Sequence, residues 1–185
     1  MADLEAGRLL VATPALVDPN FERTVVLLLD VDENGALGVV LNRPSPVPVG
    51  EILGAWSELV AEPDVLFQGG PVSADSALAV ATLPPGAEED PVGFRRLFDH
   101  TGIVDLDAPS ELFGSALTGL RIFAGYAGWG NNQLEAEIEE GSWYVLPSVP
   151  SDAFGDPRGL WARVLRRQPG ELAWVSTRPA DPTQN

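Results

Sequence analysis

Short apolar runs of strand length recur along the whole chain, and each run is closed by glycine, proline or acidic residues. Runs of about four to eight apolar residues between such breakers are typical of buried strands. The Asn34-Gly35 pair between the second and third runs is typical of a hairpin turn, so these two strands are expected to be antiparallel neighbours. We predict strands over residues 9–12, 24–29, 36–41, 65–67, 77–83, 103–106, 120–124, 143–146 and 172–176.

Apolar residues recur at helical spacing in other segments. For one predicted helix, Asn132 takes the N-cap position, Glu135 stands three residues later as in a capping box, and Gly141 is suited to ending the helix. We predict helices over residues 49–60, 133–140 and 160–168, and one helical turn over residues 109–113.

The remaining segments are expected to connect these elements. Residues 44–48 are a proline-rich connection, residues 84–93 (PPGAEEDPVG) form a polar, acidic surface loop, and residues 178–185 form a tail. Because there is no repeat and no long linker, residues 1–185 are expected to form a single domain. Many short strands with few helices favour an α+β fold in which helices pack on a mixed sheet.

The charge of the chain is strongly unbalanced, with 11 basic and 27 acidic residues and a net charge of −16. Such a field repels nucleic acid, so direct binding to nucleic acid is not expected. All the basic residues are arginine, which excludes Schiff-base and phosphate-loop lysines. The chain has no cysteine for thiol chemistry, and its one histidine, His100, cannot supply a multi-histidine metal site. We therefore expect neither a metal nor a cofactor.

The hydropathy pattern also bears on location. The N-terminal residues lack the basic start and the apolar run of a secretory signal. No apolar stretch approaches the roughly 20 residues that span a bilayer. We therefore expect a cytoplasmic protein with no membrane partner.

One acidic segment matches the first half of a calcium loop. Asp30, Asp32 and Asn34 stand before Gly35 at the spacing of the first oxygen ligands. The position that needs a bidentate glutamate is Leu41, inside a predicted strand. A plain hairpin turn explains the segment better.

Residues 125–130 (GYAGWG) lie between a predicted strand and a predicted helix, where backbone amides can bind an anion. Their spacing differs from that of a dinucleotide-binding loop, and the next helix is acidic. The glycines are also explained by tight turning and close packing under Trp129. We favour this structural interpretation.

Arg163, Arg166 and Arg167 form a basic cluster at positions i, i+3 and i+4 of a predicted helix. They could hold a phosphate backbone. In so acidic a chain, pairing with nearby carboxylates or contact with an acidic partner explains them better.

Several motifs, taken in order, resemble the AlgH/YqgE family of bacterial proteins over roughly residues 7–177. The resemblance implies an α+β fold with a curved, partly barrel-like sheet and flanking helices, in a cytosolic bacterial protein. It implies no established activity, although one branch is named for positive regulation of alginate genes. The motifs are LLVATP (9–14), DPNF (18–21), RTV (23–25), GALGVVLNRP (35–44), QGGPV (68–72), GYAGW (125–129) and the segment 133–143.

Two details qualify this resemblance. Many members carry a histidine just before the hairpin turn, whereas Val31 takes that position here, so no role of that histidine is transferred. The arginine-only basic set and the segment 160–168 are similar to those of actinobacterial members.

The segments NRP (42–44), GGPV (69–72) and GYAGW (125–129) are expected to fold against each other. With the residues around them they supply both signs of charge, an aromatic wall and backbone amides, which are the parts of a small-molecule site. Arg43 could bind a carboxylate or phosphate there, or it could tie down a loop. The candidate ligand-binding residues are Asn20, Arg23, Asn42, Arg43, Gly69, Gly70, Tyr126 and Trp129, and the candidate acid or base is Glu137.

Three functional hypotheses follow. We favour a non-enzymatic regulatory or binding protein that acts through a protein or small-molecule partner, because the chain has neither a nucleophile motif nor a cofactor lysine. The second hypothesis is an enzyme or small-molecule binder that uses the site above. The third is a direct DNA-binding regulator, which rests on the name of the family.

Overall fold

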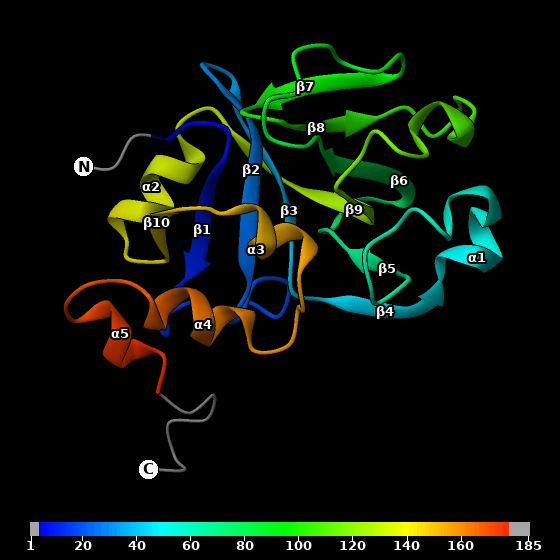
Figure 1. Cartoon of the computed structure of the whole chain (residues 1–185). Coiled ribbons are helices and arrows are strands. Elements are labelled where there is room, and N and C mark those ends of the chain that lie inside the picture. Colours follow the sequence, from blue (N-terminus) through cyan, green and yellow to red (C-terminus); the bar gives the residue numbers. More distant parts are fainter. Residues whose placement is uncertain (1–3, 178–185) are drawn as a thin grey trace.

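The computed structural model describes residues 4–177, and the predicted tail at residues 178–185 lies outside them. Within this range, ten strands form a curled sheet with the order β10-β1-β2-β3-β9-β6-β8-β7, and β4 and β5 join it beside β9 (Figure 1). Neighbouring strands are antiparallel except β5 and β9, which are parallel. The predicted α+β fold with a curved mixed sheet is confirmed.

The strands are β1 (Arg8–Ala12), β2 (Val25–Asp32), β3 (Gly35–Val40), β4 (Pro44–Pro48), β5 (Val65–Gln68), β6 (Val72–Thr82), β7 (Phe94–Phe98), β8 (Thr101–Val104), β9 (Gly119–Gly130) and β10 (Trp143–Pro147). The helices are α1 (Val49–Ile52), α2 (Gln133–Glu139), α3 (Pro150–Phe154), α4 (Leu160–Arg166) and α5 (Leu172–Val175), with 3₁₀ turns η1 (Gly54–Trp56) and η2 (Ser110–Phe113). Every helix in residues 4–177 is too short or too polar to span a lipid bilayer.

The first strands are buried on both faces. In β2, Val25 and Leu27 point into a core shared with α3 and α4, whereas Val26 and Leu28 point into the core on the other face, which α2 covers. A third core lies in the other half of the sheet, where Trp56 of η1 packs on Phe113 of η2. Burial on both faces explains why these strands appear in the sequence as continuous apolar runs.

The β2–β3 hairpin is confirmed, because Asp32 pairs with Gly35 in an antiparallel register. The longest strand, β9, joins the two halves of the sheet by pairing first with β6 and then with β3. It includes residues 125–130, which the sequence placed between a strand and a helix. Gly125 has a φ of +77°, and a Cβ there would lie 2.4 Å from the Gly70 carbonyl oxygen. Gly125 therefore fits the structural interpretation of turning and close packing. At Gly128 and Gly130 an added Cβ would meet no atom closer than 3.7 Å, so close packing does not require glycine there.

Two helical assignments differ from the prediction. The helix predicted over residues 49–60 is the short helix α1 followed by the 3₁₀ turn η1, since Gly50 and Gly54 weaken a continuous helix. Val49 and Trp56 still reach a common core. The strand predicted over residues 172–176 is wrong: this segment is α5, which packs on α4 rather than along a strand.

Three elements were not predicted. The strands β4 and β7 each pair with a single neighbour, β5 and β8 respectively. Edge strands tolerate proline and polar residues, so β4, with the sequence PSPVP, has the composition of a loop. In β7 the pair Arg95-Arg96 interrupts the apolar residues of a short strand. Helix α3 begins at Pro150, and the Asp152 carboxylate accepts a hydrogen bond from the Val149 N–H at its start.

The end signals of α2 are partly as predicted. Asn132 stands at the N-cap with a left-handed φ of 62°, and its side chain makes no capping bond. The capping box with Glu135 is therefore wrong. The Gln133 side chain accepts the hydrogen bond of the Gly130 N–H instead (3.0 Å). Gly141 follows the helix with a φ of +86°, as expected of a glycine stop.

Candidate functional site

The three motif segments lie against each other, as the sequence predicted. The Val40 N–H donates to the Gly69 carbonyl (2.9 Å), and the Gln68 N–H donates to the Arg43 carbonyl (2.8 Å). On the other side, the Gly69 N–H donates to the Ala124 carbonyl (2.9 Å). The GGPV segment is thus held between the end of β3 and the middle of β9.

The two glycines of this segment are needed by the backbones that pass them. A Cβ at Gly69 would lie 2.3 Å from the Gly125 carbonyl oxygen, and a Cβ at Gly70 would lie 2.2 Å from the carbonyl carbon of Tyr126. No side chain can adjust to remove these clashes, because both contacts are with backbone. The glycines therefore have a structural role here.

Asn42 and Arg43 hold the loop between β1 and β2. The Asn42 side chain donates to the Arg23 carbonyl (3.0 Å). The Arg43 guanidinium donates to the carbonyls of Asn20 (2.6 Å) and Glu22 (3.2 Å). Of the two roles open to Arg43 from the sequence, the structure shows the loop-tying one.

Little space remains between these segments. The hollow beside them has a volume of about 90 Å³, which is room for a few water molecules only. It is lined by Asn20, Val40, Arg43, Gln68, Gly70 and Pro71.

The candidate acid or base, Glu137, is an acceptor in an aromatic cluster. Its Oε1 atom accepts hydrogen bonds from the indole N–H groups of Trp129 (3.2 Å) and Trp143 (3.1 Å). Its Oε2 atom accepts one from Gln133 (3.1 Å). The Phe21 ring lies 6.1 Å from Trp129 and 5.6 Å from Trp143. Glu137 thus joins α2 to the sheet, and these contacts do not support an acid or base role.

Tyr126 and Trp129 do not share a site wall. They stand three positions apart in one strand, so their side chains point to opposite faces. Tyr126 packs on the core under α4, and Trp129 belongs to the core under α2. The nine candidate residues are therefore divided between the two faces of the sheet.

The β2–β3 turn shows the geometry of a plain hairpin. The Asn34 N–H donates to the Asp32 side chain (2.7 Å), which closes the turn locally. Within residues 4–177, no group of three or more acidic or histidine side chains is arranged to hold a metal ion.

A cleft that the sequence did not indicate lies between the β7–β8 turn and α3. Its volume is about 280 Å³. Much of its wall is apolar, and the apolar lining includes Leu83, Phe98, Val149, Pro150, Ala153 and Phe154. The polar lining includes Thr82, His100, Thr101, Thr118, Ser148 and Asp152. Apart from the adjacent His100 and Thr101, these polar residues come from separate stretches of the chain, so no sequence motif marked them.

The hydroxyl groups in this cleft are bound to each other or to backbone. Thr101 donates to the Thr82 hydroxyl (3.2 Å), and Thr118 donates to the Thr82 carbonyl (3.2 Å). The Ser148 hydroxyl donates to the Gly7 carbonyl. The His100 imidazole is half-buried and makes no side-chain hydrogen bond within the described part of the chain.

An ion pair between a buried carboxylate and a partly exposed arginine fixes the α3 wall of the cleft. Asp152 is 4% exposed, and its two carboxylate oxygens accept hydrogen bonds from the Arg167 guanidinium, each of 2.7 Å. These bonds raise the pKa of Arg167. The pair connects α3 to the end of α4.

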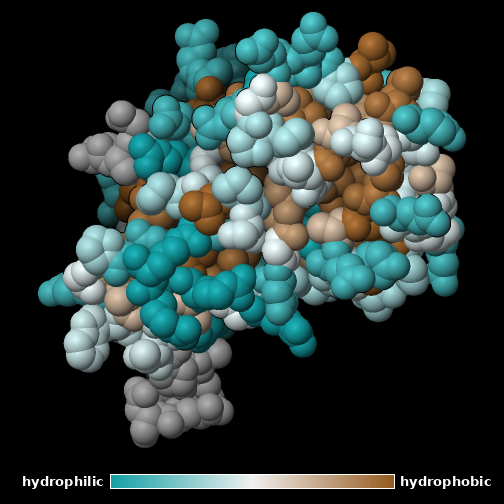
Figure 2. Space-filling model, in the orientation of Figure 1, coloured by the Kyte–Doolittle hydropathy of each residue, from teal (hydrophilic) through white to brown (hydrophobic). Residues whose placement is uncertain are grey.

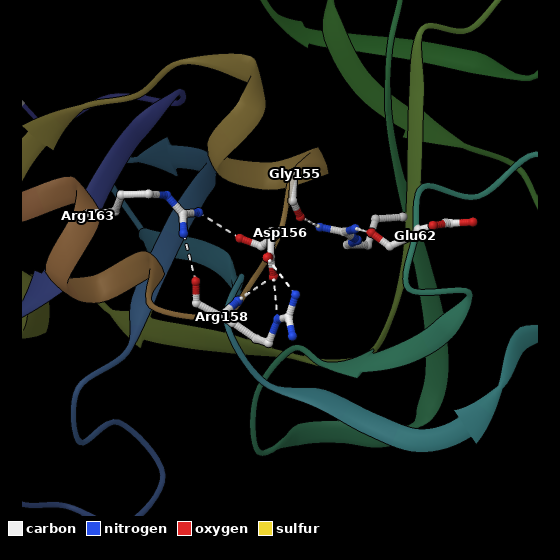
Figure 3. Close-up of polar contacts among 6 residues, drawn as sticks. Glu62, Gly155, Asp156, Arg158 and Arg163 are labelled. Atoms are coloured by element: carbon white, nitrogen blue, oxygen red, sulfur yellow. Dashed lines mark hydrogen bonds and ion pairs between the residues drawn. The ribbon is translucent and has the colours of Figure 1, made fainter.

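Behind the cleft lies a buried arginine that sequence reasoning missed. Arg121 is 1% exposed and donates to the carbonyls of Ala153 (2.7 Å), Gly155 (3.0 Å) and Glu62 (2.6 Å). Figure 3 shows the carbonyl groups of Glu62 and Gly155 that accept these hydrogen bonds. The Arg121 guanidinium also lies over the Phe67 ring. Burial lowers the pKa of Arg121 to about 10.

The signal for this residue was present in the sequence. Arg121 stands two positions before Phe123 in an apolar strand, and period-two alternation places both side chains on one buried face. A charged residue at such a position is rare unless partners surround it.

The arginines of α4 are not displayed as one basic face. Arg163 donates to the carbonyls of Asp156 (2.6 Å) and Arg158 (2.7 Å), as Figure 3 shows. Arg167 is bound to the carboxylate of α3, and Arg166 is exposed. The surface over α4 is hydrophilic in Figure 2. Pairing with nearby acceptors explains two of the three arginines.

The comparisons with known proteins agree over nearly the whole chain. The AlgH-like family model matches residues 9–173. A UPF0301 protein of Streptomyces coelicolor is 63% identical over 182 residues, which cover 97% of this chain and 94% of that protein. A crystal structure of a Corynebacterium diphtheriae protein superimposes with a TM-score of 0.90 at 34% identity, covering 96% of this chain and 94% of the other. The solution structure of the AlgH protein from Pseudomonas aeruginosa gives 0.70 at 25% identity, covering 97% and 98%.

Proposed function

The chain belongs to the AlgH-like family, and we propose that it is a non-enzymatic binding protein that takes a small, largely apolar molecule in the cleft between the β7–β8 turn and α3. The observation that carries the proposal is the cleft itself. Its lining combines an apolar wall with a few converging polar groups, which is the usual make-up of a small-molecule site.

The size and lining of the cleft define the class of ligand. A volume of about 280 Å³ accommodates a molecule of one or two rings. Phe98 and Phe154 offer aromatic surface to the body of such a ligand. The imidazole of His100 offers a polar contact for one end, as donor or acceptor according to its tautomer.

The contacts in the cleft favour binding over catalysis. Nucleophilic catalysis needs a hydroxyl hydrogen-bonded to a base that a third group orients. Here the Ser148 hydroxyl is bound to a backbone carbonyl, and the Asp152 carboxylate is neutralised by Arg167. Neither group is joined to His100 by a hydrogen bond in residues 4–177.

The position of the cleft supports a regulatory role. A ligand there touches the β7–β8 turn on one side and α3 on the other. Because Asp152 ties α3 to Arg167, a ligand that stabilises α3 also stabilises the end of α4. The partner that would respond to this change stays open between a protein and a second small molecule.

Direct nucleic-acid binding is not part of this proposal. The net charge of −16 opposes it, and the guanidinium groups of Arg163 and Arg167 are bound within the chain. We expect the protein to work in the cytoplasm without a membrane partner.

The proposal is tested by titrating the full chain with indole and following backbone amides by heteronuclear NMR. We expect shifts at residues 98–101 and 148–154, with a dissociation constant of about 1 mM, which is typical of so small a probe. The variant Val149→Trp should fill the mouth of the cleft, since Val149 is 46% exposed there, and should abolish the shifts.

A matched control is Val92→Trp, which introduces the same side chain at an exposed loop position outside the cleft. It should leave indole binding unchanged. The proposal is wrong if no shifts appear at the cleft residues, or if the two variants behave alike.

A further inference from the structure

The hydroxyl groups that line the cleft between the β7–β8 turn and α3 use their protons within the protein. Because a carbonyl oxygen can only accept, the Thr82 hydroxyl donates to the His100 carbonyl 3.4 Å away. The Thr101 hydroxyl in turn donates to the Thr82 hydroxyl oxygen (3.2 Å). The Thr118 and Ser148 hydroxyls also donate to backbone carbonyls. These last two are the more exposed, and what they still offer an incoming ligand is oxygen lone pairs.

A carboxylate at the β7–β8 turn adds a negative charge to this lining. Asp99 is exposed and lines the cleft. Within residues 4–177, its carboxylate takes part in no ion pair and accepts no hydrogen bond. The other carboxylate of the cleft, that of Asp152, differs because both of its oxygens accept hydrogen bonds from Arg167. Asp99 can therefore bind a cation without giving up a partner.

The positive charges next to the cleft are already matched. Among the described residues that line it there is no arginine. Of the arginines beside it, Arg96 pairs with Asp90 (2.6 Å) and Arg167 pairs with Asp152 (2.7 Å). Arg96 also donates to the backbone carbonyl of Asp99 (2.7 Å), which holds the turn. The charge that the cleft presents is therefore that of Asp99, in a chain whose net charge of −16 attracts cations and repels anions.

We propose that the ligand of this cleft is a protonated amine carried on an aromatic or other apolar body. The inference rests on the small-molecule binding proposed above and names the class of ligand. An ammonium group has a positive charge and only hydrogen-bond donors. These donors match the lone pairs of Thr118 and Ser148, and the charge matches the carboxylate of Asp99.

The rest of the lining suits a cation better than an anion. The faces of the Phe98 and Phe154 rings carry negative potential, which attracts an ammonium group. The neutral imidazole of His100 offers one ring nitrogen as a further acceptor. A carboxylate ligand would find this imidazole as the only side-chain donor among the described lining residues.

The test compares three indole compounds that differ in the charge of one side arm: tryptamine is a cation, tryptophol is neutral and indole-3-acetate is an anion. Each is titrated into the full chain at low ionic strength, and the backbone amides of residues 98–101 and 148–154 are followed by NMR. We expect tryptamine to bind about fivefold more tightly than tryptophol, the upper end of the gain from an exposed ion pair. Indole-3-acetate should bind more weakly than tryptophol.

Asp99→Asn removes the charge and keeps the turn, since asparagine tolerates the left-handed φ of 47° found at Asp99. It should bring the affinity for tryptamine to within about twofold of that for tryptophol, and it should leave tryptophol binding unchanged. The matched control is Asp107→Asn, which removes an exposed carboxylate outside the cleft. It should leave the preference for tryptamine within about twofold of wild type, as expected for a screened surface charge.

The outcomes separate this inference from the proposal on which it rests. If tryptophol shifts the cleft amides and tryptamine binds no more tightly, the amine class is wrong while binding in the cleft stands. If none of the three compounds shifts these amides, both are wrong. Equal loss of the tryptamine preference in Asp99→Asn and Asp107→Asn also overturns the inference, because the net charge of the chain would then explain the preference.

Discussion

The guanidinium of Arg121 lies 4.3 Å from the centre of the Phe67 ring, in the interior of the protein. Its charge is met by three backbone carbonyl groups and the face of this ring. The acceptors belong to α3, the turn after it and the segment before β5. One side chain of β9 therefore holds together segments that are distant in sequence.

Replacing Arg121 with methionine should destabilise the fold strongly. Methionine fills the space, but it leaves one buried and two partly buried carbonyl groups without their donor, and each loss at a buried group costs about 1–3 kcal/mol. The removal of a buried charge offsets part of this. We expect the free energy of unfolding in urea to fall by about 3 kcal/mol.

The control for this experiment is Arg95→Met, at an exposed position in the edge strand β7. It should change the free energy of unfolding by less than about 0.5 kcal/mol. If Arg121→Met were as stable as this control, the three carbonyl contacts would not hold α3 in place.

The ion pair between Asp152 and Arg167 supports a second prediction. Arg167→Gln leaves the Asp152 carboxylate buried with a weaker donor. Removing one partner of a buried pair costs about 3–5 kcal/mol, and the partial exposure of Arg167 reduces this to about 2 kcal/mol. The double variant Arg167→Gln with Asp152→Asn should recover part of the loss in urea unfolding. Additive losses would show that the two side chains do not interact.

Much of the fold could be predicted from local signals. Asn34-Gly35 between two apolar runs identified the β2–β3 hairpin. Asn132 and Gly141 marked the ends of the helix predicted over residues 133–140, which is α2. The elements that were missed or misassigned depend on their surroundings. The strand β4 carries three prolines and exists because β5 lies beside it, and α5 is helical because it packs on α4.

The candidate site was less predictable for a different reason. The motifs predicted correctly that residues 42–44, 69–72 and 125–129 lie against each other. The glycines there allow backbones to pass closely, and the polar side chains bind backbone groups rather than a ligand. The cleft is lined by residues such as His100 and Ser148, which come from separate segments and form no motif. Sequence spacing reports neighbours along one element, whereas a cleft is formed by several elements.

Glu137 provides a third prediction, because it serves two indole groups at once. Glu137→Gln keeps a carbonyl oxygen as acceptor and should lower the free energy of unfolding by less than about 1 kcal/mol. Glu137→Ala leaves the N–H groups of Trp129 and Trp143 without this acceptor and should cost about 2 kcal/mol. Tryptophan fluorescence should shift in the alanine variant, and Glu139→Ala on the exposed side of α2 should change neither quantity. Equal losses for Glu137→Ala and Glu139→Ala would contradict this role.

Gly70 provides a fourth prediction about the meeting point of the motif segments. Gly70→Ala places a Cβ 2.2 Å from the backbone of Tyr126, so β9 must shift away from the GGPV segment. We expect a loss of about 3 kcal/mol, in the range of other overpacked or strained sites. Gly54→Ala is the control, since no atom lies within 4 Å of its added Cβ, and it should be neutral or slightly stabilising. A stable Gly70→Ala protein would show that the strands are not packed so closely.

The pairing of Asp156 with Arg158 leads to a prediction about pH. Hydrogen bonds from Arg158 hold the pKa of Asp156 below its ordinary value of 3.8. The contact is therefore complete above pH 3.8 and is lost as the pH falls through the lowered pKa. Carboxyl titration by NMR should show the low value in wild type and a return toward 3.8 in Arg158→Gln. An Asp156 titration that is the same in Arg158→Gln as in wild type would show that Arg158 does not lower this pKa.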